Sequence, residues 1–476
     1  MMPMNLSFKK EQKKVLITFS LIEAAGSYIF ATIQTLLIFY LIDELHLSHA
    51  ISAELVGTII GMLCLSSLLG GYIGEYLLNY YVTMLLGTLV LSLGCLIMVL
   101  ANSENTLFIA LTLISISAGL IRPNTSSFIG KFYDQTQARE SQRDFGFNVL
   151  YVAVNAGSTL ATFSAFYLRN KYGFNDTFFV LLFVASASSL MMILGFYFLK
   201  KYQSHRGITL KSFFYTLILL IVFVLFVFYI LKNPLFADIV FIVTTIFCVV
   251  TLLLSARSGQ MHRAIAFFIF FALGILYFCV YSQLFISLLL FIHYCVNHQV
   301  FGFELNTSQF ITSECFFILC LGFFMGKIWI FFENKKKSVL DIDKFKLSFL
   351  LIGIMYALIY GAIALSAPAE KIPGWIIILS FFFMAVSELS LMPIGYSMIT
   401  KIAPKGYVSL YMGIWVVTIG IGSKLAGEIS SFIKINKDVV SSKQTMSHGL
   451  LGLIILSVLG IVFCFLMRKM TTPRVS

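Results

Sequence analysis

Charged residues are scarce in this sequence. Asp, Glu, Lys and Arg make up 11% of its 476 residues, whereas apolar residues make up 59%. A soluble domain carries roughly 25% charged residues, so this composition excludes an ordinary soluble globular protein. It predicts a polytopic membrane protein whose length leaves little room for a soluble domain.

The usual sequence patterns of nucleotide, metal and hydrolytic sites are also missing. No Walker, GxGxxG, HExxH or GxSxG pattern stands in a suitable context, which argues against a nucleotide-driven pump or a membrane hydrolase. The eight cysteines are scattered singly, without a CxxC or a metal-ligand spacing, and fit structural filler better. We therefore expect a protein that is not an enzyme and that holds no metal.

Long apolar runs are plentiful, and runs of about 20 residues or more are candidates for transmembrane helices. Fourteen are predicted, at 15–42, 52–79, 81–101, 106–131, 145–169, 175–200, 211–231, 234–256, 262–293, 306–332, 345–366, 374–402, 406–433 and 447–468. An even number places both termini on one side of the bilayer. The first run is too long for the apolar part of a signal peptide and carries Glu23, so no cleavable signal is predicted.

The net charge of +12 follows from this topology. Most cations lie near the two termini and in the loops that share their side of the membrane, between alternate pairs of predicted helices. That distribution is typical of the positive-inside rule, so the termini are predicted to be cytoplasmic and the membrane to be the inner one. The charge therefore indicates no nucleic-acid partner, and the surrounding partner is the lipid bilayer.

Two apolar runs share a pattern that predicts an internal repeat. Arg122 and Glu388 each lie shortly before a proline, and identical spacing continues from there through Pro123, Ser127, Ile129, Lys131 and through Pro393, Ser397, Ile399, Lys401. A charge near the middle of a membrane helix costs about 2.5–3.5 kcal/mol on insertion scales, so it must face a partner or a wet cavity. We predict that Arg122 and Glu388 face each other across a central cavity between two pseudo-symmetric halves.

The predicted helices at 211–231 and 234–256 stand apart from this repeat. The second contains Asp238 but no other charged side chain between Lys232 and Arg257, as in a lipid-facing hairpin. The predicted parts are an N-terminal six-helix bundle at 1–203, an inserted transmembrane hairpin at 204–260 and a C-terminal six-helix bundle at 261–476. Five glycines of the second helix are predicted to allow close helix packing: Gly57, Gly61, Gly70, Gly71 and Gly74.

Several other polar residues lie inside predicted helices. Glu23 and Glu314 each lie about eight residues into a helix, where a carboxylate is typically a proton relay, an ion-pair partner or a cavity residue. Snorkelling toward the cytoplasm is the alternative for Glu23, and hydrogen bonding between helices is the alternative for Asn155. Lys424 either pairs with a carboxylate or snorkels.

Two long stretches carry a more specific pattern. Residues 119–133 continue through 143–157, and residues 388–404 follow in the second half of the chain. Shorter segments match at Leu68–Glu75, Tyr281–Gln283, Phe301–Glu304, Met412–Trp415 and Leu425–Gly427. Together these segments, which span nearly the whole chain, resemble the proton-dependent oligopeptide transporters of the major facilitator superfamily.

The resemblance implies an all-α membrane protein with the major facilitator fold, two six-helix bundles plus the inserted hairpin. It implies a proton-coupled secondary transporter that imports di- and tripeptides or peptide-like solutes by alternating access. The implied partners are a small peptide and protons, the energy source is the proton gradient without a cofactor, and the expected state is a monomer. Its implied substrate residues are Gln34, Arg122, Asn155, Glu314, Glu388 and Trp415, and its implied coupling residues are Glu23, Arg122, Glu314 and Glu388.

Within this pattern, Arg122 is expected to take a peptide's carboxylate, and Asn155, Glu314 and Glu388 its amino group. Deprotonated Glu388 is expected to pair with Arg122 and hold one gate, and protonated Glu388 to release Arg122 for the substrate.

The sequence departs from the family pattern at several positions. The first-helix motif Glu-x-x-Glu-Arg reads Glu23-Ala-Ala-Gly26-Ser27, so its second glutamate and its arginine are lost. Further replacements are Gln34 for a cation, Cys64 for a tyrosine, Arg122 for a lysine, Ser282 for a glutamate and Glu314 for an asparagine. Losing both partners of a buried ion pair is nearly neutral, so one pair between the bundles is predicted to be deleted.

The extra acid leaves alternatives open. Glu314 favours cationic ligands, or it takes over proton binding from the missing glutamate. One rival is therefore a transporter of another small solute, such as an amino acid, a cationic compound or a drug, with altered proton coupling. Another rival is a membrane sensor or scaffold that does not transport.

Overall fold

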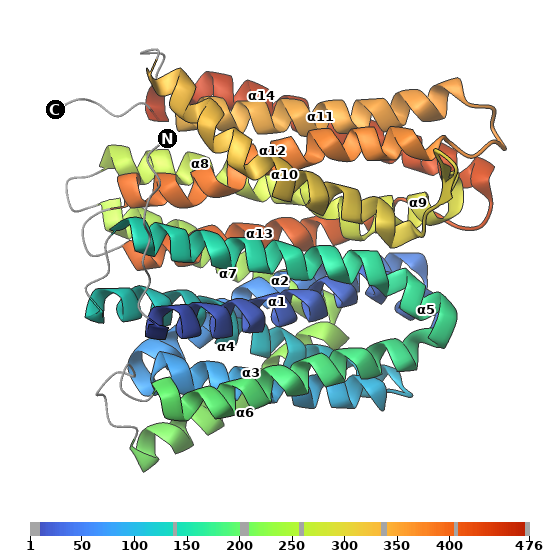
Figure 1. Cartoon of the computed structure of the whole chain (residues 1–476). Coiled ribbons are helices and arrows are strands. Elements are labelled where there is room, and N and C mark those ends of the chain that lie inside the picture. The colour runs from blue at the N-terminus through green and yellow to red at the C-terminus, as the bar shows by residue number, and fades with distance from the viewer. Residues whose placement is uncertain are drawn as a thin grey trace. The chain divides into compact units, whose positions relative to one another are not determined.

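A computed structural model of the chain describes residues 10–136, 140–199, 209–256, 261–334, 340–403 and 408–471. Helices dominate these ranges (Figure 1). The first seven α-helices are α1 (Lys10–Phe39), α2 (His49–Tyr72), α3 (Tyr80–Val99), α4 (Glu104–Gln135), α5 (Glu140–Leu199), α6 (Leu210–Lys232) and α7 (Pro234–Ala256). The remaining ones are α8 (Met261–Tyr281), α9 (Ser287–Cys295), α10 (Thr307–Asn334), α11 (Asp341–Leu365), α12 (Gly374–Ile402), α13 (Val408–Ser431) and α14 (Val439–Thr471).

Three short turns extend or interrupt these helices. π-helical turns continue α1 and α2 over Tyr40–Glu44 and Ile73–Leu77, and a 3-10 turn over Ser282–Phe285 separates α8 from α9. A small antiparallel hairpin, β1 (Gln299–Val300) and β2 (Phe303–Glu304), follows α9. The apolar pattern did not predict this hairpin, because its strands are only two residues long.

Each predicted membrane run falls on helical structure. Within the described ranges, twelve helical segments are long and apolar enough to cross a membrane. One of them, in α5, covers two predicted runs. Gly173 (φ +84°) breaks the helix between these two runs. The predicted run at 306–332 lies on α10, whose described apolar stretch is the shorter Thr307–Gly322. The prediction of an all-α membrane fold is confirmed.

Packing divides the chain into two compact units. Unit 1 comprises the described parts of Met1–Ile33 and Met62–Lys232, and unit 2 those of Gln34–Gly61 and Asn233–Ser476. The two helices of the predicted hairpin go to different units, α6 to unit 1 and α7 to unit 2. The proposed bundle boundaries at 203 and 260 rest on the sequence pattern and remain a prediction.

Small residues let the helices of unit 1 approach closely. A Cβ on Gly70 of α2 would collide with the backbone of Gly119 in α4, and a Cβ on Gly74 would collide with the Asn124 side chain. Asn124 also donates a 2.9 Å hydrogen bond to the Gly70 carbonyl, which ties α4 to α2. The predicted packing role therefore applies at Gly70 and Gly74, whereas a Cβ on Gly71 would meet open space.

Unit 2 is held by apolar contacts and by hydrogen bonds between helices. Figure 1 shows α11 alongside α12 and α14, and these helices pack on one another. Ser348 of α11 and Ser387 of α12 each donate to the other's carbonyl, at 2.7 and 2.8 Å. Such bonds between membrane helices contribute about 0.6 kcal/mol each on average, so they orient the helices more than they stabilise them. They also set the position of Glu388, the next residue of α12.

Candidate functional site

Two acids and a tyrosine meet inside unit 2. The Tyr281 hydroxyl at the end of α8 lies 2.7 Å from a carboxyl oxygen of Glu388 and 3.2 Å from one of Glu314. Both carboxyl groups therefore lie at the same phenol hydroxyl. We call Tyr281, Glu314 and Glu388 the acid cluster. Three separate helices, α8, α10 and α12, supply its members.

The three members of the acid cluster differ in how exposed they are. Glu314 is buried at 2% exposed, whereas Tyr281 and Glu388 are half-buried. Cys315 places its thiol 3.6 Å from the second oxygen of Glu314. One acid therefore lies deep in the unit, and its partner keeps a side-chain surface that a solute can approach.

A layer of aromatic and hydroxyl groups supports Tyr281. The ring of Tyr277 stacks on it with centroids 5.9 Å apart, and the Tyr277 hydroxyl lies 3.1 Å from that of Ser387. Behind them, the Tyr356 hydroxyl of α11 donates to the Val280 carbonyl at 2.7 Å. These contacts limit the rotation of Tyr281, so the separations within the acid cluster are set by packing.

The break between α8 and α9 lies next to the acid cluster and is held by polar contacts with α13. Gln283 donates to the Ala426 carbonyl at 3.0 Å, and its side-chain oxygen accepts from Ser287 at 2.6 Å and from Ser430 at 2.5 Å. Ser282 lies 2.8 Å from Ser423. A serine at 282 thus joins α8 to α13, whereas the acid that the family pattern expects there would add a third carboxylate to this region.

Unit 1 contains a second, smaller set of predicted residues. The Arg122 guanidinium lies over the Phe30 ring, 4.8 Å from its centroid, and the residue is exposed. Glu23 is buried at 9% exposed, and its carboxyl group interacts electrostatically with Arg122. Within the described residues, its Oε1 has no hydrogen-bond partner. The burial of Glu23 argues against snorkelling, and its roles as a relay or an ion-pair partner stay predictions.

The other predicted residues lie in varied surroundings. Asn155 is half-buried on α5 and donates a 2.9 Å hydrogen bond to the Tyr151 carbonyl of its own helix. Gln34 is half-buried on α1 and belongs to unit 2, although Glu23 on the same helix belongs to unit 1. Because Arg122 and Glu388 belong to different units, their pairing stays a prediction.

Trp415 differs from what a substrate residue requires. Its side chain is fully buried at 0% exposed, and its ring packs edge-on against Phe278 and Phe345. A Cβ on Gly395 would collide with the same ring. In this structure Trp415 belongs to the core of unit 2 and offers no surface to a solute.

Unit 2 contains a buried ion cluster, of which the sequence predicted the lysine but not its partners. The Lys424 ammonium, whose side chain is 3% exposed, lies 2.6 Å from Asp238 on α7 and 3.0 Å from Glu428 one turn along α13. We call these three residues the lysine cluster. The pairing alternative for Lys424 is the correct one, and snorkelling is not. Asp238 could be singled out from the sequence as the lone charge within its run, but its partner could not.

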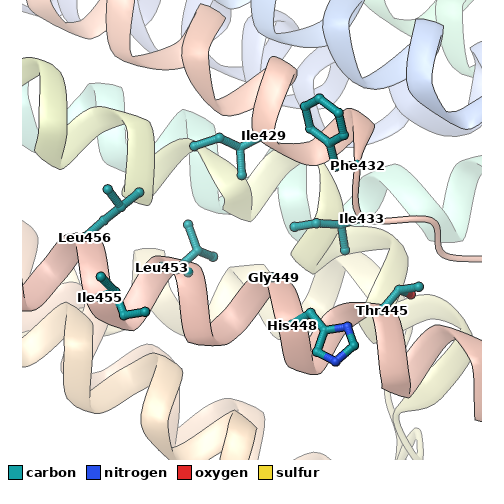
Figure 2. A pocket seen from close by; sticks show the side chains of 10 residues that line it. Ile429, Phe432, Ile433, Thr445, His448, Gly449, Leu453, Ile455 and Leu456 are labelled. Atoms are coloured by element: carbon teal, nitrogen blue, oxygen red, sulfur yellow. The ribbon is translucent and has the colours of Figure 1, made fainter.

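An apolar cavity of about 540 Å³ lies elsewhere in unit 2, between the end of α13 and α14 (Figure 2). Ile429 of α13, Ile433 in the loop that follows it and Leu453 of α14 are among its lining residues, and Thr445 and His448 are its polar ones. Such a lining does not provide the fixed charges that a zwitterionic peptide needs. The acid cluster is therefore the stronger candidate site.

The helices and the intramembrane acids define a multi-pass membrane protein of the transporter class. Residues 81–446 match the POT family, so the chain belongs to that family of transporters. The predicted family is thereby confirmed.

Relatives and solved structures agree with this assignment. The chain is 24% identical to dipeptide and tripeptide permease B of Salmonella typhimurium over 427 residues, 85% of each protein. It is 26% identical to dipeptide and tripeptide permease A of Chromobacterium violaceum over 451 residues, 92% of this chain and 88% of the relative.

Two solved structures resemble the chain over almost its whole length. A bacterial homologue of human drug peptide transporters gives a TM-score of 0.81 at 22% identity, covering 97% of this chain and 100% of the other. Tetrameric PepTSo2 gives a TM-score of 0.82 at 22% identity over the same shares. At such identities the likeness establishes the fold alone, which the chain shares with these solved transporters.

Proposed function

We propose that the protein is a proton-coupled secondary transporter that imports di- and tripeptides or peptide-like solutes by alternating access. Membership of the POT family and the named permease relatives support the substrate class. The observation that carries the proposal is the acid cluster, since two carboxyl groups that share one tyrosine inside an apolar unit are costly unless they bind a proton or a cation.

The two ends of a peptide require opposite charges. Glu388, half-buried and backed by Glu314, is the proposed acceptor of the amino group. Arg122 is the proposed donor to the carboxylate, because a guanidinium binds a carboxylate through two parallel hydrogen bonds. Asn155 and Gln34 are proposed to bind the peptide backbone, and the buried Trp415 is left with a supporting role.

Proton coupling is proposed to involve Glu23 and Glu388. Glu23 lies close enough to Arg122 to sense its charge. A peptide carboxylate that engages Arg122 would change the electrostatic potential at Glu23 and thereby its proton occupancy. Coupling in unit 1 would then depend on one acid, because Gly26 and Ser27 carry no charge.

The membrane arrangement completes the proposal. The bacterial permease relatives support the inner membrane, and the loop cations support cytoplasmic termini. We propose a monomer as the functional unit, since each chain carries both the acids and the arginine. A reporter that works only in the cytoplasm should be active when it is fused to either terminus. A reporter that works only outside the cytoplasm should be inactive there, and its activity would overturn the orientation.

Uptake into proteoliposomes tests the function directly. Purified protein should accumulate labelled Ala-Ala when the outside is made acidic, and a proton ionophore should abolish the accumulation. The double variant Arg122→Gln, Glu388→Gln should lose gradient-driven uptake, whereas Glu104→Gln, at an exposed helix start, should retain it. Full gradient-driven uptake by the double variant would contradict the proposed roles.

A second candidate, transport of a cationic compound, is favoured by one observation. Glu314 adds a buried carboxyl next to Glu388 where the family pattern has an amide. A thermal-shift screen of peptides against amines and cationic drugs separates the two, because the transported class should stabilise the protein more strongly.

A further inference from the structure

The hydrogen-bond contacts of the acid cluster need more protons than the Tyr281 hydroxyl supplies. Tyr281 has one hydroxyl proton but lies within hydrogen-bond distance of two carboxyl oxygens. The phenol can donate to only one of them, so a second hydrogen bond at Tyr281 requires a protonated carboxyl group that donates to the phenol oxygen. Geometry thus calls for at least one proton held by the carboxyl groups in addition to the phenol proton.

The surroundings of the acid cluster explain why that proton is retained. The titratable groups that contact the two acids are Tyr281 from α8 and Cys315 from α10, and the Tyr277 ring stacks on Tyr281. None of these groups is a cation. Where no cation among the described residues contacts them, two neighbouring carboxylates repel each other, which favours a proton on one of them, as in the paired carboxyls of aspartic proteases.

We propose that Glu314 and Glu388 form a one-proton carboxyl pair that exchanges this proton for a second ammonium group of the substrate. With its proton, the pair carries one negative charge and matches the single amino group of an ordinary dipeptide. Without it, the pair carries two negative charges and matches a dication. The preferred substrates are therefore peptides with a second ammonium group near the N-terminus, such as those that begin with lysine. This inference rests on the proposed function.

The exchange step is balanced. The second ammonium group, which brings its own positive charge, forms a hydrogen bond to a carboxylate oxygen of the pair. The O–H bond of the protonated carboxyl breaks, and its proton passes through Glu388, the half-buried member, to solvent. No electron is transferred. The pair with its proton and one bound ammonium group is neutral before the exchange. The pair without its proton and with two bound ammonium groups is neutral after it. Tyr281 keeps its proton and serves as a positioning residue.

Proton release measured by calorimetry tests the exchange without transport. Binding of Ala-Ala and of Lys-Ala to the purified protein is titrated near pH 6.5 in two buffers that differ in ionisation enthalpy. We expect Lys-Ala to release about one more proton than Ala-Ala. We also expect Lys-Ala to bind about 10–100-fold more tightly, because a charge-assisted bond to a buried acid adds roughly that factor. Equal proton release by the two dipeptides would overturn the proposal on the unaltered protein alone.

Variants locate the effect on the pair. Glu314→Gln keeps the shape of the side chain but removes the exchangeable proton. The two dipeptides should then release equal numbers of protons and bind with about equal affinity. Tyr281→Phe should leave the extra proton release intact, because the phenol proton is not exchanged. Glu104→Gln should behave as the unaltered protein. An unchanged preference in Glu314→Gln would exclude this residue as the determinant.

A pair of probe amines separates this inference from the proposed function. The probes are 1,5-diaminopentane and pentylamine. If the diamine binds with proton release but neither dipeptide binds, the carboxyl pair is supported and peptide transport is refuted. If Ala-Ala is transported while the diamine and Lys-Ala release no extra proton, transport stands and the one-proton pair is refuted. If none of the four compounds binds, both are overturned.

Discussion

Replacement of Lys424 by methionine is the most informative single test of how unit 2 is held together. The Lys424 ammonium lies 2.6 Å from Asp238 and 3.0 Å from Glu428, and its side chain is 3% exposed. Because Asp238 lies on α7 and Lys424 on α13, the contact joins a helix of the predicted hairpin to a helix of the predicted C-terminal bundle. Methionine keeps the length and apolar stem of the side chain while it removes the charge.

The magnitude follows from the exposure of the partners. Breaking a fully buried ion pair by removing one member costs about 3–5 kcal/mol, because the other charge is left uncompensated. The Asp238 and Glu428 side chains are each 39% exposed, so water can solvate part of the stranded charge. We therefore expect Lys424→Met to lower the free energy of unfolding by about 1–3 kcal/mol.

Thermal unfolding in detergent, combined with a double-mutant cycle, measures this contribution. Lys424→Met, Asp238→Asn and their combination should give a coupling free energy of about 1–2 kcal/mol. Lys437→Met, an exposed lysine in the loop after α13, is the matched control and should change stability by less than about 0.5 kcal/mol. If Lys424→Met is as stable as the control and the cycle shows no coupling, the lysine cluster does not hold α7 on α13.

Three further predictions concern other parts of the chain. Gly70→Ala should destabilise unit 1 by about 1–3 kcal/mol or prevent folding, because its Cβ would collide with the α4 backbone, while Gly71→Ala should be tolerated or stabilise by up to about 1 kcal/mol; size-exclusion profiles and melting temperatures compare the two. Burial lowers the pKa of His298, in the loop after α9, below its ordinary 6.5. As the pH falls, the imidazole therefore binds a proton in the unfolded chain before it does so in the folded protein, and stability should decline below about pH 6.5. The melting temperature should drop less between pH 7.5 and 5.5 in His298→Gln than in the unaltered protein. Arg122→Lys should weaken dipeptide binding by about tenfold, since an ammonium makes neither the two-bond contact with a carboxylate nor the same stacking on Phe30.

Each of these three has a clear contrary result. Equal stability of the Gly70 and Gly71 variants would mean that the close approach of α2 and α4 is not needed. Identical pH dependence with and without the His298 imidazole would remove that group as the source of acid sensitivity. Unchanged dipeptide affinity in Arg122→Lys would place the peptide carboxylate elsewhere.

Much of the fold could be predicted, because a bilayer imposes a simple rule on the sequence. A helix that crosses it needs about 20 apolar residues, so each predicted run coincides with helical structure. The same rule failed for β1 and β2, since a two-residue strand has no periodicity to detect. It also could not show that α6 and α7 belong to different units, because two apolar neighbours look alike whichever surface each one covers.

The candidate site was predicted in its acids but not in its arrangement. Glu314 and Glu388 were identifiable because charges in apolar helices are rare and costly. Tyr281 was found only as part of a motif, since a tyrosine in a membrane helix is common and signals nothing by itself. Trp415 was expected at the substrate site, but its burial against Phe278 and Phe345 depends on how α8, α11 and α13 pack.

The sequence by itself determined the membrane class, the positions of the helices, the family and the charges that need a reason, because hydrophobic length and the cost of buried charge act residue by residue. Tertiary structure alone decided which of those charges meet. Tyr281 reaches Glu388 across 107 positions of the chain, and Lys424 reaches Asp238 from another helix. Such contacts depend on the rotation and crossing of packed helices, which a one-dimensional pattern of apolar and polar residues does not specify.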